Sequence, residues 1–455
     1  MALTRRVTAF TAACVLVSNM IGTGIFGTTG FMAADLGRPW LILSLWAAGA
    51  LFSLLGAFCY AELGASWPRA GGEYVYIREA YGRLPGFLSG WMSLSIGFSA
   101  AIATNAHLFA DYLRQLFPVL LPTSEAGWQA RLEQTYALEL AMVWGLTAVH
   151  AAGVGPGGAL QRALTIFKVA AMLLLIAAGL ALGNGDWSHL GQSDPSVGVH
   201  LNTALVSFMF VTFSYSGWNA ASYLAEEMVE PARNLPRAMI WGTLAVGALY
   251  LAMNVTYLYA LPVAQLAADP IEPVGHKTAT VLLGGETGRW FSALLGVSIL
   301  GAASAMIWAG PRVYFAMARD GVFPAYFART GAQSHAPVGS IVLQSAWVSV
   351  LVVTGSFEAL VRYATFALIA FAGLAVAAVI VMRRRAPDHP RPYRVPGYPW
   401  TPVVFLIVSA AILVAALQLS PRESLLGVVT ILAGIPLYFL WRRSPSAPDA
   451  AEPGS

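Results

Sequence analysis

Apolar residues fill long stretches of this chain, and short polar segments separate the stretches. Each stretch is about twenty residues long, which is the length an α-helix needs to cross the hydrocarbon core of a bilayer. The pattern predicts an all-α integral membrane protein with twelve transmembrane helices. The predicted helices cover residues 8–34, 39–64, 86–113, 136–153, 160–183, 200–229, 235–262, 289–318, 338–355, 358–382, 400–418 and 424–441.

Composition supports a single membrane domain over residues 1–443. The 455 residues are 57% hydrophobic and 11% charged, whereas a soluble protein is about 25% charged. Cys14 and Cys59 both lie inside apolar stretches, so no disulfide framework is indicated. The first apolar stretch has no separate cleavable character, so we expect an uncleaved first span. The polar, proline-rich tail at 444–455 is predicted to be disordered.

The basic residues predict the orientation of the helices. Eighteen of the 26 Lys and Arg residues fall in segments on the N-terminal side of the membrane, seven fall on the opposite side, and Lys168 lies within a span. Positive residues concentrate on the cytoplasmic side. We therefore expect a multi-pass protein of the inner or plasma membrane with both termini in the cytoplasm. The net charge of +4 reflects this topology and gives no reason to invoke nucleic acid.

Two of the predicted helices contain a break in mid-membrane. Ser18–Phe26 in the first span carries Gly22 and Gly24, and each glycine costs a helix interior about 1 kcal/mol relative to alanine. Phe213–Asn219 in the sixth span is a run of small and polar residues. Irregular backbone at this depth is tolerated where it is buried in protein or lines a polar cavity. The alternative is that the small residues only let helices pack closely.

The two breaks are related in position. Each lies about fourteen residues into its span, and the two spans cross the membrane in opposite directions. This relation is typical of an inverted repeat of five helices. A chance pairing of two glycine-rich packing sites is the alternative.

A broken helix exposes unsatisfied backbone groups on both sides of the gap. The half-helix that follows Gly22 presents free N–H groups through Ile25 and the positive end of its dipole, which suit a carboxylate. The half-helices that end near Ile21 and Phe213 present free carbonyl groups, which suit an ammonium group. Glycine permits close approach of a ligand to the backbone. A cavity with both complements predicts a zwitterionic ligand such as an amino acid.

The charged side chains narrow the class of ligand. Apart from Lys168, no ionisable acid or base is predicted well inside the bundle. The remaining acids near span ends are expected to form interfacial ion pairs with arginines such as Arg69, Arg233, Arg237 and Arg319. These acids are Asp35, Asp111, Glu139 and Glu358 outside, and Glu62, Glu226, Glu227, Glu230 and Asp320 inside. With no carboxylate available for a substrate cation, we favour neutral amino acids over cationic amino acids or polyamines.

Lys168 is predicted to lie about 12 Å from the cytoplasmic end of the fifth span, at 1.5 Å per residue. An intramembrane charge is costly and indicates function. Desolvation would suit Lys168 to proton coupling, or it acts as a fixed cation. The structural alternative is a lysine whose side chain extends back to the interface.

Signs of an enzyme are missing from the sequence. There is no P-loop, no histidine spacing typical of a metal site, and no convergent catalytic set. We expect no catalytic residues, no metal and no cofactor.

Several motifs, in order along most of the chain, resemble the amino acid–polyamine–organocation (APC) superfamily, and within it bacterial relatives of the L-type amino acid transporters. The motifs are Gly22–Phe26, Ala61–Gly64, Pro68–Tyr76, Tyr215–Asn219, Ala225–Glu227, Pro231–Arg237, Arg312–Gly321 and Arg391–Gly397.

The resemblance implies a five-plus-five inverted repeat over about 8–183 and 200–382, with broken helices 1 and 6 and two extra helices over about 400–441. It implies that the backbone at Gly22–Gly24 holds the substrate carboxylate and that carbonyls near Ile21 and Phe213 hold the amine. The implied substrate-binding residues are Ile21, Gly22, Thr23, Gly24, Ile25, Phe213, Ser214, Tyr215, Ser216 and Gly217.

The resemblance also implies coupling and gating roles. Phe213 matches an aromatic external gate, and Lys168 matches a lysine that takes the place of a sodium ion in sodium-coupled relatives. Tyr257 looks like the tyrosine linked to that lysine.

The chain departs from the family pattern at two places. No cysteine lies between the third and fourth spans, so no covalently linked heavy chain is expected, and Ser216 stands where glycine is also common, which puts the pocket width in doubt.

Together these observations predict a secondary transporter for neutral amino acids that works by alternating access, as an exchanger or a proton-coupled permease. Its partners are then the amino acid, protons in the coupled case, and the lipid bilayer. A transporter of cationic amino acids or polyamines is the alternative within this class. A non-transporting amino acid sensor is the alternative from another class.

Overall fold

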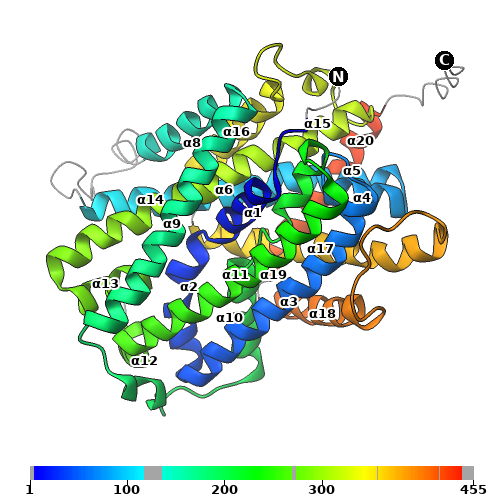
Figure 1. Cartoon of the computed structure of the whole chain (residues 1–455). Helices are drawn as coiled ribbons and strands as arrows, with labels where there is room; N and C mark the ends of the chain where they lie inside the picture. Colours follow the sequence, from blue (N-terminus) through cyan, green and yellow to red (C-terminus); the bar gives the residue numbers. More distant parts are fainter. Residues whose placement is uncertain (1–4, 117–135, 269–272, 356, 420, 443–455) are drawn as a thin grey trace, which may run out of the picture.

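The computed structural model describes residues 5–116, 136–268, 273–355, 357–419 and 421–442. Over these residues the chain is helical and contains no β-strand, only an isolated bridge between Val7 and Met228. The helices pack into one bundle, and both ends of the described chain lie at the top of Figure 1. The predicted tail at 444–455 lies outside the described residues.

The long helices follow the apolar stretches of the sequence. Nine helical stretches of the described chain are long and apolar enough to cross a membrane, and α10 and α16 are shorter apolar helices. The helices are α1 (Ala9–Met20), α2 (Thr23–Leu36), α3 (Pro39–Ser66), α4 (Glu73–Tyr81), α5 (Arg83–Met92), α6 (Phe98–Leu116), α8 (Tyr136–Ala151), α9 (Val154–Leu182), α10 (Leu201–Ser214), α11 (Pro231–Ala260), α12 (Val263–Leu266), α13 (Val274–Leu283), α14 (Gly285–Ala309), α15 (Pro311–Arg319), α16 (Val338–Thr354), α17 (Phe357–Arg385), α18 (Trp400–Leu419), α19 (Pro421–Leu432) and α20 (Gly434–Trp441).

The packing places α1 and α2 in the centre of the bundle. α1 packs against α9, α11, α14 and the 3₁₀-helix η4 (Ala220–Glu227), and α2 packs against α10, α12 and α13. In the most apolar eighteen-residue segment of α1 and α2, 78% of the residues are buried, whereas 33% are buried in the corresponding segment of α9. Because a helix at the periphery of a membrane bundle keeps one side for lipid, this contrast identifies α1 and α2 as core helices.

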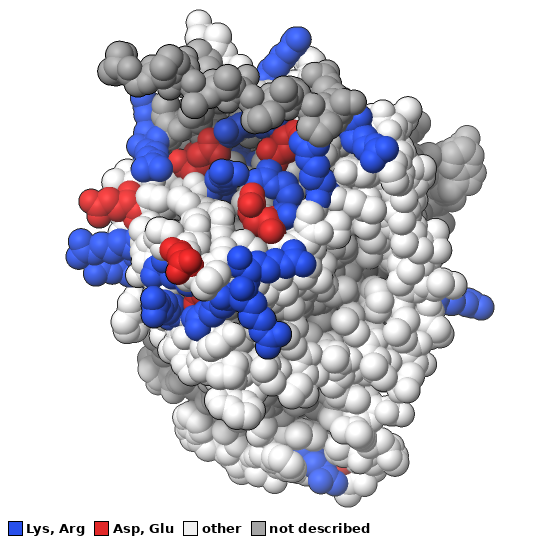
Figure 2. Space-filling view, turned by 90° about the vertical axis from the view of Figure 1, so that its right-hand side faces the viewer, with Lys and Arg blue, Asp and Glu red and all other residues white. Residues whose placement is uncertain are grey.

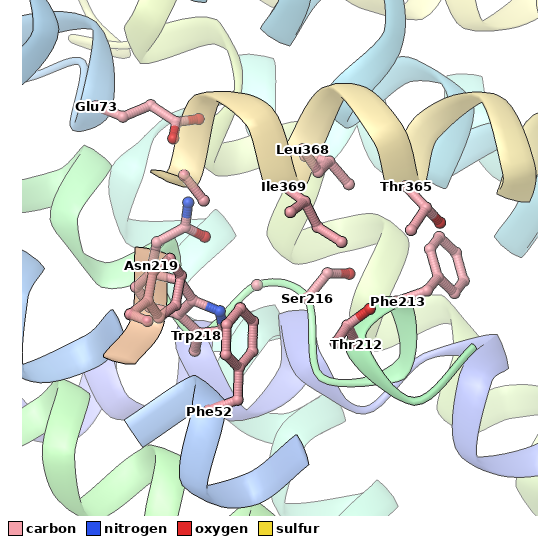
Figure 3. Close-up of a pocket in the computed structure, with 13 residues that line it drawn as sticks. Phe52, Glu73, Thr212, Phe213, Ser216, Trp218, Asn219, Thr365, Leu368 and Ile369 are labelled. Atoms are coloured by element: carbon pink, nitrogen blue, oxygen red, sulfur yellow. The ribbon is translucent and has the colours of Figure 1, made fainter. Parts of the chain in front are cut away.

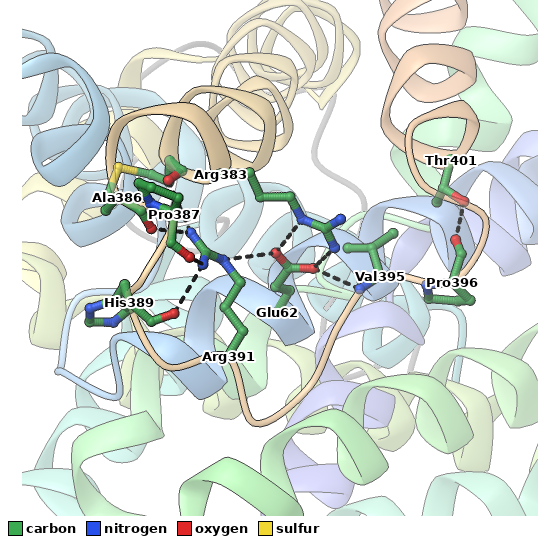
Figure 4. A network of polar contacts seen from close by, with 10 residues as sticks. Glu62, Arg383, Ala386, Pro387, His389, Arg391, Val395, Pro396 and Thr401 are labelled. Atoms are coloured by element: carbon green, nitrogen blue, oxygen red, sulfur yellow. Dashed lines mark hydrogen bonds and ion pairs between the residues drawn. The ribbon is translucent and has the colours of Figure 1, made fainter.

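Charged residues gather at one end of the molecule. Figure 2 shows most Lys, Arg, Asp and Glu side chains of one face near its top, above a broad uncharged flank. Figure 4 shows how one carboxylate joins three segments there. Glu62 on α3 accepts hydrogen bonds of 2.8 and 2.5 Å from Arg383 at the end of α17, and one of 2.7 Å from the N–H group of Val395. Arg391 lies 3.7 Å from the same carboxylate.

The predicted interfacial ion pairs are confirmed for four acids at this end. Glu62 pairs with Arg383, Glu227 with Arg312, Glu226 with Arg319, and Asp320 with Arg78. The partners differ from those expected, since Arg319 is the only predicted arginine that pairs with one of these acids. Arg69 contacts Glu79 instead. Arg233 and Arg237 form no ion pair with any described residue, so the prediction was wrong for these two.

Candidate functional site

The first predicted break is present and is two residues long. α1 ends at Met20 and α2 begins at Thr23, so Ile21 and Gly22 form the gap. The start of α2 has no side-chain cap. Its first N–H groups, on Thr23, Gly24 and Ile25, therefore have no partner within the helix.

The second predicted break is also present. α10 ends at Ser214, a turn follows, and the chain continues as the 3₁₀-helix η4 from Ala220. Gly217 in this turn has a φ of 99°, a left-handed conformation that favours glycine. A Cβ atom at Gly217 would also lie 2.8 Å from the Asn19 side chain. Glycine is therefore required here by both backbone conformation and space.

The two breaks pack directly against each other. A Cβ atom at Gly24 would lie 2.3 Å from the hydroxyl oxygen and 2.5 Å from the Cα atom of Ser214, so α2 and α10 are in backbone contact. The Tyr250 hydroxyl on α11 donates to the carbonyl oxygen of Met20 at 2.6 Å and contacts that of Ser214 at 3.1 Å. One tyrosine thus joins the last turns of the two half-helices.

Lys168 on α9 lies at the first break. Its ammonium group is fully buried and donates hydrogen bonds to the carbonyl oxygens of Ser18 at 3.0 Å and Ile21 at 2.5 Å. A Cβ atom at Gly301 on α14 would lie 2.8 Å from the Lys168 side chain, so this glycine makes room for it. The geometry excludes the alternative in which Lys168 extends to the membrane interface.

Tyr257 does not contact Lys168 through a hydrogen bond in this structure. Its hydroxyl is buried and has no hydrogen-bond partner among the described residues. Tyr250, two helical turns earlier on α11, makes the contacts at the breaks instead. Tyr250 was not predicted from the sequence, although the seven-residue spacing places it on the same face of the helix as Tyr257.

Two neighbouring cavities open beside the second break. The first lies between the turn after α10 and α17, with Glu73, Phe213, Ser216 and Asn219 on its wall (Figure 3). The second lies toward α1 and α6, where Asn19 and Phe98 line it. Both cavities share Glu73, Ser216, Gly217, Asn219 and Leu368.

The predicted substrate residues divide into two groups. Phe213, Ser216 and Gly217 line the cavities. The others are buried at the breaks or in helix contacts and line neither cavity; they are Ile21, Gly22, Thr23, Gly24, Ile25, Ser214 and Tyr215. The carbonyl oxygens of Ile21 and Phe213 each accept a bond already, from Lys168 and from the Ser216 N–H group. A carbonyl oxygen has two lone pairs, so each keeps one further acceptor position.

Glu73 is a second site residue that was not predicted from the sequence. It begins α4, is 3% exposed, and lines both cavities. Its carboxylate accepts hydrogen bonds from the hydroxyl groups of Tyr60 at 2.6 Å and Tyr223 at 2.9 Å, and it has no ion pair with a described residue. Burial raises the pKa of Glu73, and these two hydrogen bonds oppose the rise. The expectation that no carboxylate reaches the cavity was therefore wrong.

The cavity wall contains further polar groups. Asn219 donates to the Tyr223 hydroxyl at 3.0 Å, which extends the Glu73 network to the second break. The side-chain oxygen of Asn19 is buried without a partner among the described residues. A π-helical turn at Ser93–Gly97 separates α5 from α6 and places Ser93 and Gly97 at the second cavity. Such turns often occur at functional sites. This turn was not predicted, because the sequence of the span is apolar and continuous.

The geometry suits reversible binding of a small polar molecule. It combines free N–H groups at a helix start, carbonyl oxygens with spare lone pairs, and a cavity with one carboxylate. Among the described residues there is no group of three or more His, Cys, Asp or Glu that could hold a metal ion.

Comparison with known proteins extends over nearly the whole chain. A family model described as amino acid permease matches residues 7–441. The large neutral amino acids transporter small subunit 2 of Homo sapiens is 30% identical over 98% of this chain and 82% of its own length. The Asc-type amino acid transporter 1 of Mus musculus is 29% identical over 98% of this chain and 83% of its length. The b(0,+)-type amino acid transporter 1 of Mus musculus is 27% identical over 94% and 86%.

Proposed function

Because the chain belongs to the amino acid permease family of the APC superfamily, we propose that it is a secondary active transporter that moves neutral amino acids across the membrane by alternating access. The observation that carries this proposal is the direct packing of two interrupted helices beside a buried lysine and a polar cavity. Exchange of amino acids and proton-coupled uptake are both compatible with it. The protein is then a transporter and not an enzyme.

The proposed fold has twelve spans in two inverted repeats of five, over about 8–183 and 200–382, with two extra helices at the end. The opposite polarity of the two breaks supports it: α2 packs against α10, and α1 packs against η4. The first half of each broken helix thus contacts the second half of the other, as expected for two antiparallel helices. The charged end in Figure 2 supports cytoplasmic termini in the cell membrane.

We place the substrate carboxylate on the N–H groups from Thr23 to Ile25, at the positive end of α2. The amine binds the free lone pairs of the Ile21 and Phe213 carbonyl groups. Ser214 occupies the α10 side of Gly24 in this structure, so the carboxylate approaches from the side of the Ile21–Gly22 gap. Ser216 and Gly217 then border the substrate side chain, and Phe213 is the gate.

Coupling depends in this proposal on Lys168, which binds the carbonyl of the same Ile21. A fixed ammonium group holds the break in one geometry, whereas loss of its proton would weaken its two hydrogen bonds to Ser18 and Ile21, because a neutral amine is a weaker donor. We also assign a coupling role to Tyr257 on α11. We propose no covalently linked heavy chain, because the sequence lacks a cysteine between the third and fourth spans.

Transport of cationic amino acids is the second candidate function. The specific observation that favours it is the buried Glu73 carboxylate, which lines both cavities without a cationic partner in the described chain. A substrate ammonium or guanidinium group would be such a partner. The relatives named above include both large neutral and b(0,+)-type transporters.

Counterflow in liposomes tests these alternatives. Purified protein is reconstituted with unlabelled amino acid inside, and uptake of labelled neutral and cationic amino acids is measured with and without a pH gradient. Uptake of neutral amino acids supports the proposal, and a dependence on the gradient identifies proton coupling. Binding of amino acids without flux would instead identify a sensor.

A further inference from the structure

A shallow groove lies at the charged end of the bundle, away from the two cavities. α11 contributes Ala232, Arg233, Pro236, Arg237, Ile240 and Trp241, and the connection between α17 and α18 contributes Pro392 and Tyr393. Nothing in the proposed transport cycle uses this groove. Its two arginines have no ion pair with a described residue, whereas Arg312, Arg319 and Arg383 at the same end each pair with a glutamate.

The chemistry of the groove changes along α11. Arg233, Arg237 and Trp241 are spaced by four residues, so they lie on one face of the helix. At 1.5 Å per residue, the row covers about 12 Å along the helix axis. Both arginines are exposed, and Trp241 is 70% exposed. The charged groups therefore begin the row at the end of the bundle, and the aromatic ring ends it on the apolar flank.

The groove also offers donors from a second direction. α11 begins at Pro231 without a side-chain cap, so the positive end of its dipole lies beside Arg233. Tyr393 forms part of the opposite wall. Its hydroxyl is protonated at neutral pH and can donate a hydrogen bond.

We propose that this groove binds the head group of an anionic phospholipid of the cytoplasmic leaflet. Two guanidinium groups bind a phosphate through paired, charge-assisted hydrogen bonds. Trp241 lies where aromatic residues meet the membrane interface, and Ile240 and Trp241 continue the groove toward the acyl chains. Basic pockets between helices on this side of a membrane bind such head groups. Free phosphate offers the same charge but has no apolar part for Ile240 and Trp241.

The test measures lipid binding to the full-length protein in detergent. Native mass spectrometry and thermal melting are recorded with phosphatidylglycerol, with phosphatidylcholine and with inorganic phosphate. We expect phosphatidylglycerol to bind and to raise the melting temperature, and the other two to do neither. The double variant R233Q/R237Q is expected to weaken binding by roughly tenfold or more. The control R329Q/R384Q removes two exposed arginines outside the groove and is expected to leave binding unchanged.

Two further variants keep the test decisive if R233Q/R237Q fails to fold. R233K/R237K retains the charge and loses the paired geometry, so an intermediate affinity is expected. Trp241→Ala is expected to weaken binding of the lipid. Equal binding of phosphatidylglycerol and phosphatidylcholine, equal loss in the control variant, or equal stabilisation by inorganic phosphate would each overturn the proposal.

Discussion

The ammonium group of Lys168 lies 2.5 Å from the carbonyl oxygen of Ile21, the first residue after α1 ends at Met20. This contact links α9 to the first break. We assign the second lone pair of the same Ile21 carbonyl oxygen to the substrate amine. A change in the Lys168 contact is therefore transmitted directly to the proposed substrate site.

Replacement of Lys168 by methionine is expected to abolish or strongly reduce flux. The variant keeps a long unbranched side chain but lacks the ammonium group, so the carbonyl groups of Ser18 and Ile21 lose their donor. An unsatisfied buried group costs about 1–3 kcal/mol. Counterflow between pH 5 and pH 9 is the measurement. Ile166→Val, on the exposed side of α9, is the control. Wild-type flux of Lys168→Met at every pH would contradict the coupling role.

Replacement of Gly24 by alanine is expected to impair transport, and replacement by leucine to abolish substrate binding. The added Cβ atom would lie 2.5 Å from the Cα atom of Ser214, so α2 and α10 must separate. Overpacking of this kind costs about 1–3 kcal/mol.

Gly27→Ala is a matched control for Gly24 on the same helix, because a Cβ atom at Gly27 meets no atom within 4 Å. Substrate-induced thermal stabilisation and counterflow report on both variants. Normal substrate affinity in Gly24→Leu would contradict the assignment of the carboxylate to this helix start.

Replacement of Glu73 by glutamine is expected to reduce uptake of cationic amino acids while uptake of neutral ones persists. The change keeps the shape of the side chain and removes its charge. The new NH2 group donates, so one of the two tyrosine hydroxyl groups must accept a hydrogen bond from it instead of donating. Because burial raises the pKa of Glu73, the wild-type carboxylate takes up its proton at a higher pH than an exposed glutamate. Cationic uptake by the wild type should therefore fall as the pH decreases through that pKa.

Glu73→Asp retains the charge and is the control for this prediction. Competition of lysine and leucine for uptake, measured across the acidic pH range, gives both the selectivity and the pH profile. If the wild type takes up no cationic amino acid at any pH, the second candidate function is excluded and the neutral assignment stands.

Replacement of Arg312 by methionine is expected to destabilise the protein strongly. Arg312 and Glu227 are each 1% exposed and lie 2.9 Å apart, so the variant leaves a buried carboxylate without its cation. Breaking a buried pair costs about 3–5 kcal/mol. Thermal melting in detergent measures the loss, and R312M/E227Q should recover part of it.

The pair between Arg319 and Glu226 is the comparison for Arg312. The Arg319 side chain is 41% exposed, and an exposed pair contributes about 0–1 kcal/mol. Arg319→Met should therefore melt close to the wild type. Equal melting temperatures of the Arg312 and Arg319 variants would show that burial of the ion pair has no energetic consequence here.

Much of the secondary structure was predictable because apolar length and glycine placement act locally. The breaks at Gly22 and at Gly217 were found from residues within the same turn of chain. The π-helical turn at Ser93–Gly97 was not, since its residues read as an unbroken apolar helix. Arg233 and Arg237 were assigned to ion pairs because acids are near in sequence, yet those acids pair with Arg312 and Arg319, which come from α15.

The candidate site also has features that the local sequence predicts and features that depend on helix packing. By itself the sequence determined a helical membrane protein of the amino acid permease family, its two interrupted helices, and an internal lysine, because hydropathy, glycine and charge are properties of single positions. Only the tertiary structure decided that Lys168 contacts Ile21, that Tyr250 rather than Tyr257 joins the breaks, and that Glu73 enters the cavity wall. Each of these depends on which helices pack together. Lys168 is 147 residues from Ile21, Tyr250 is 230 residues from Met20, and Glu73 is 150 residues from Tyr223.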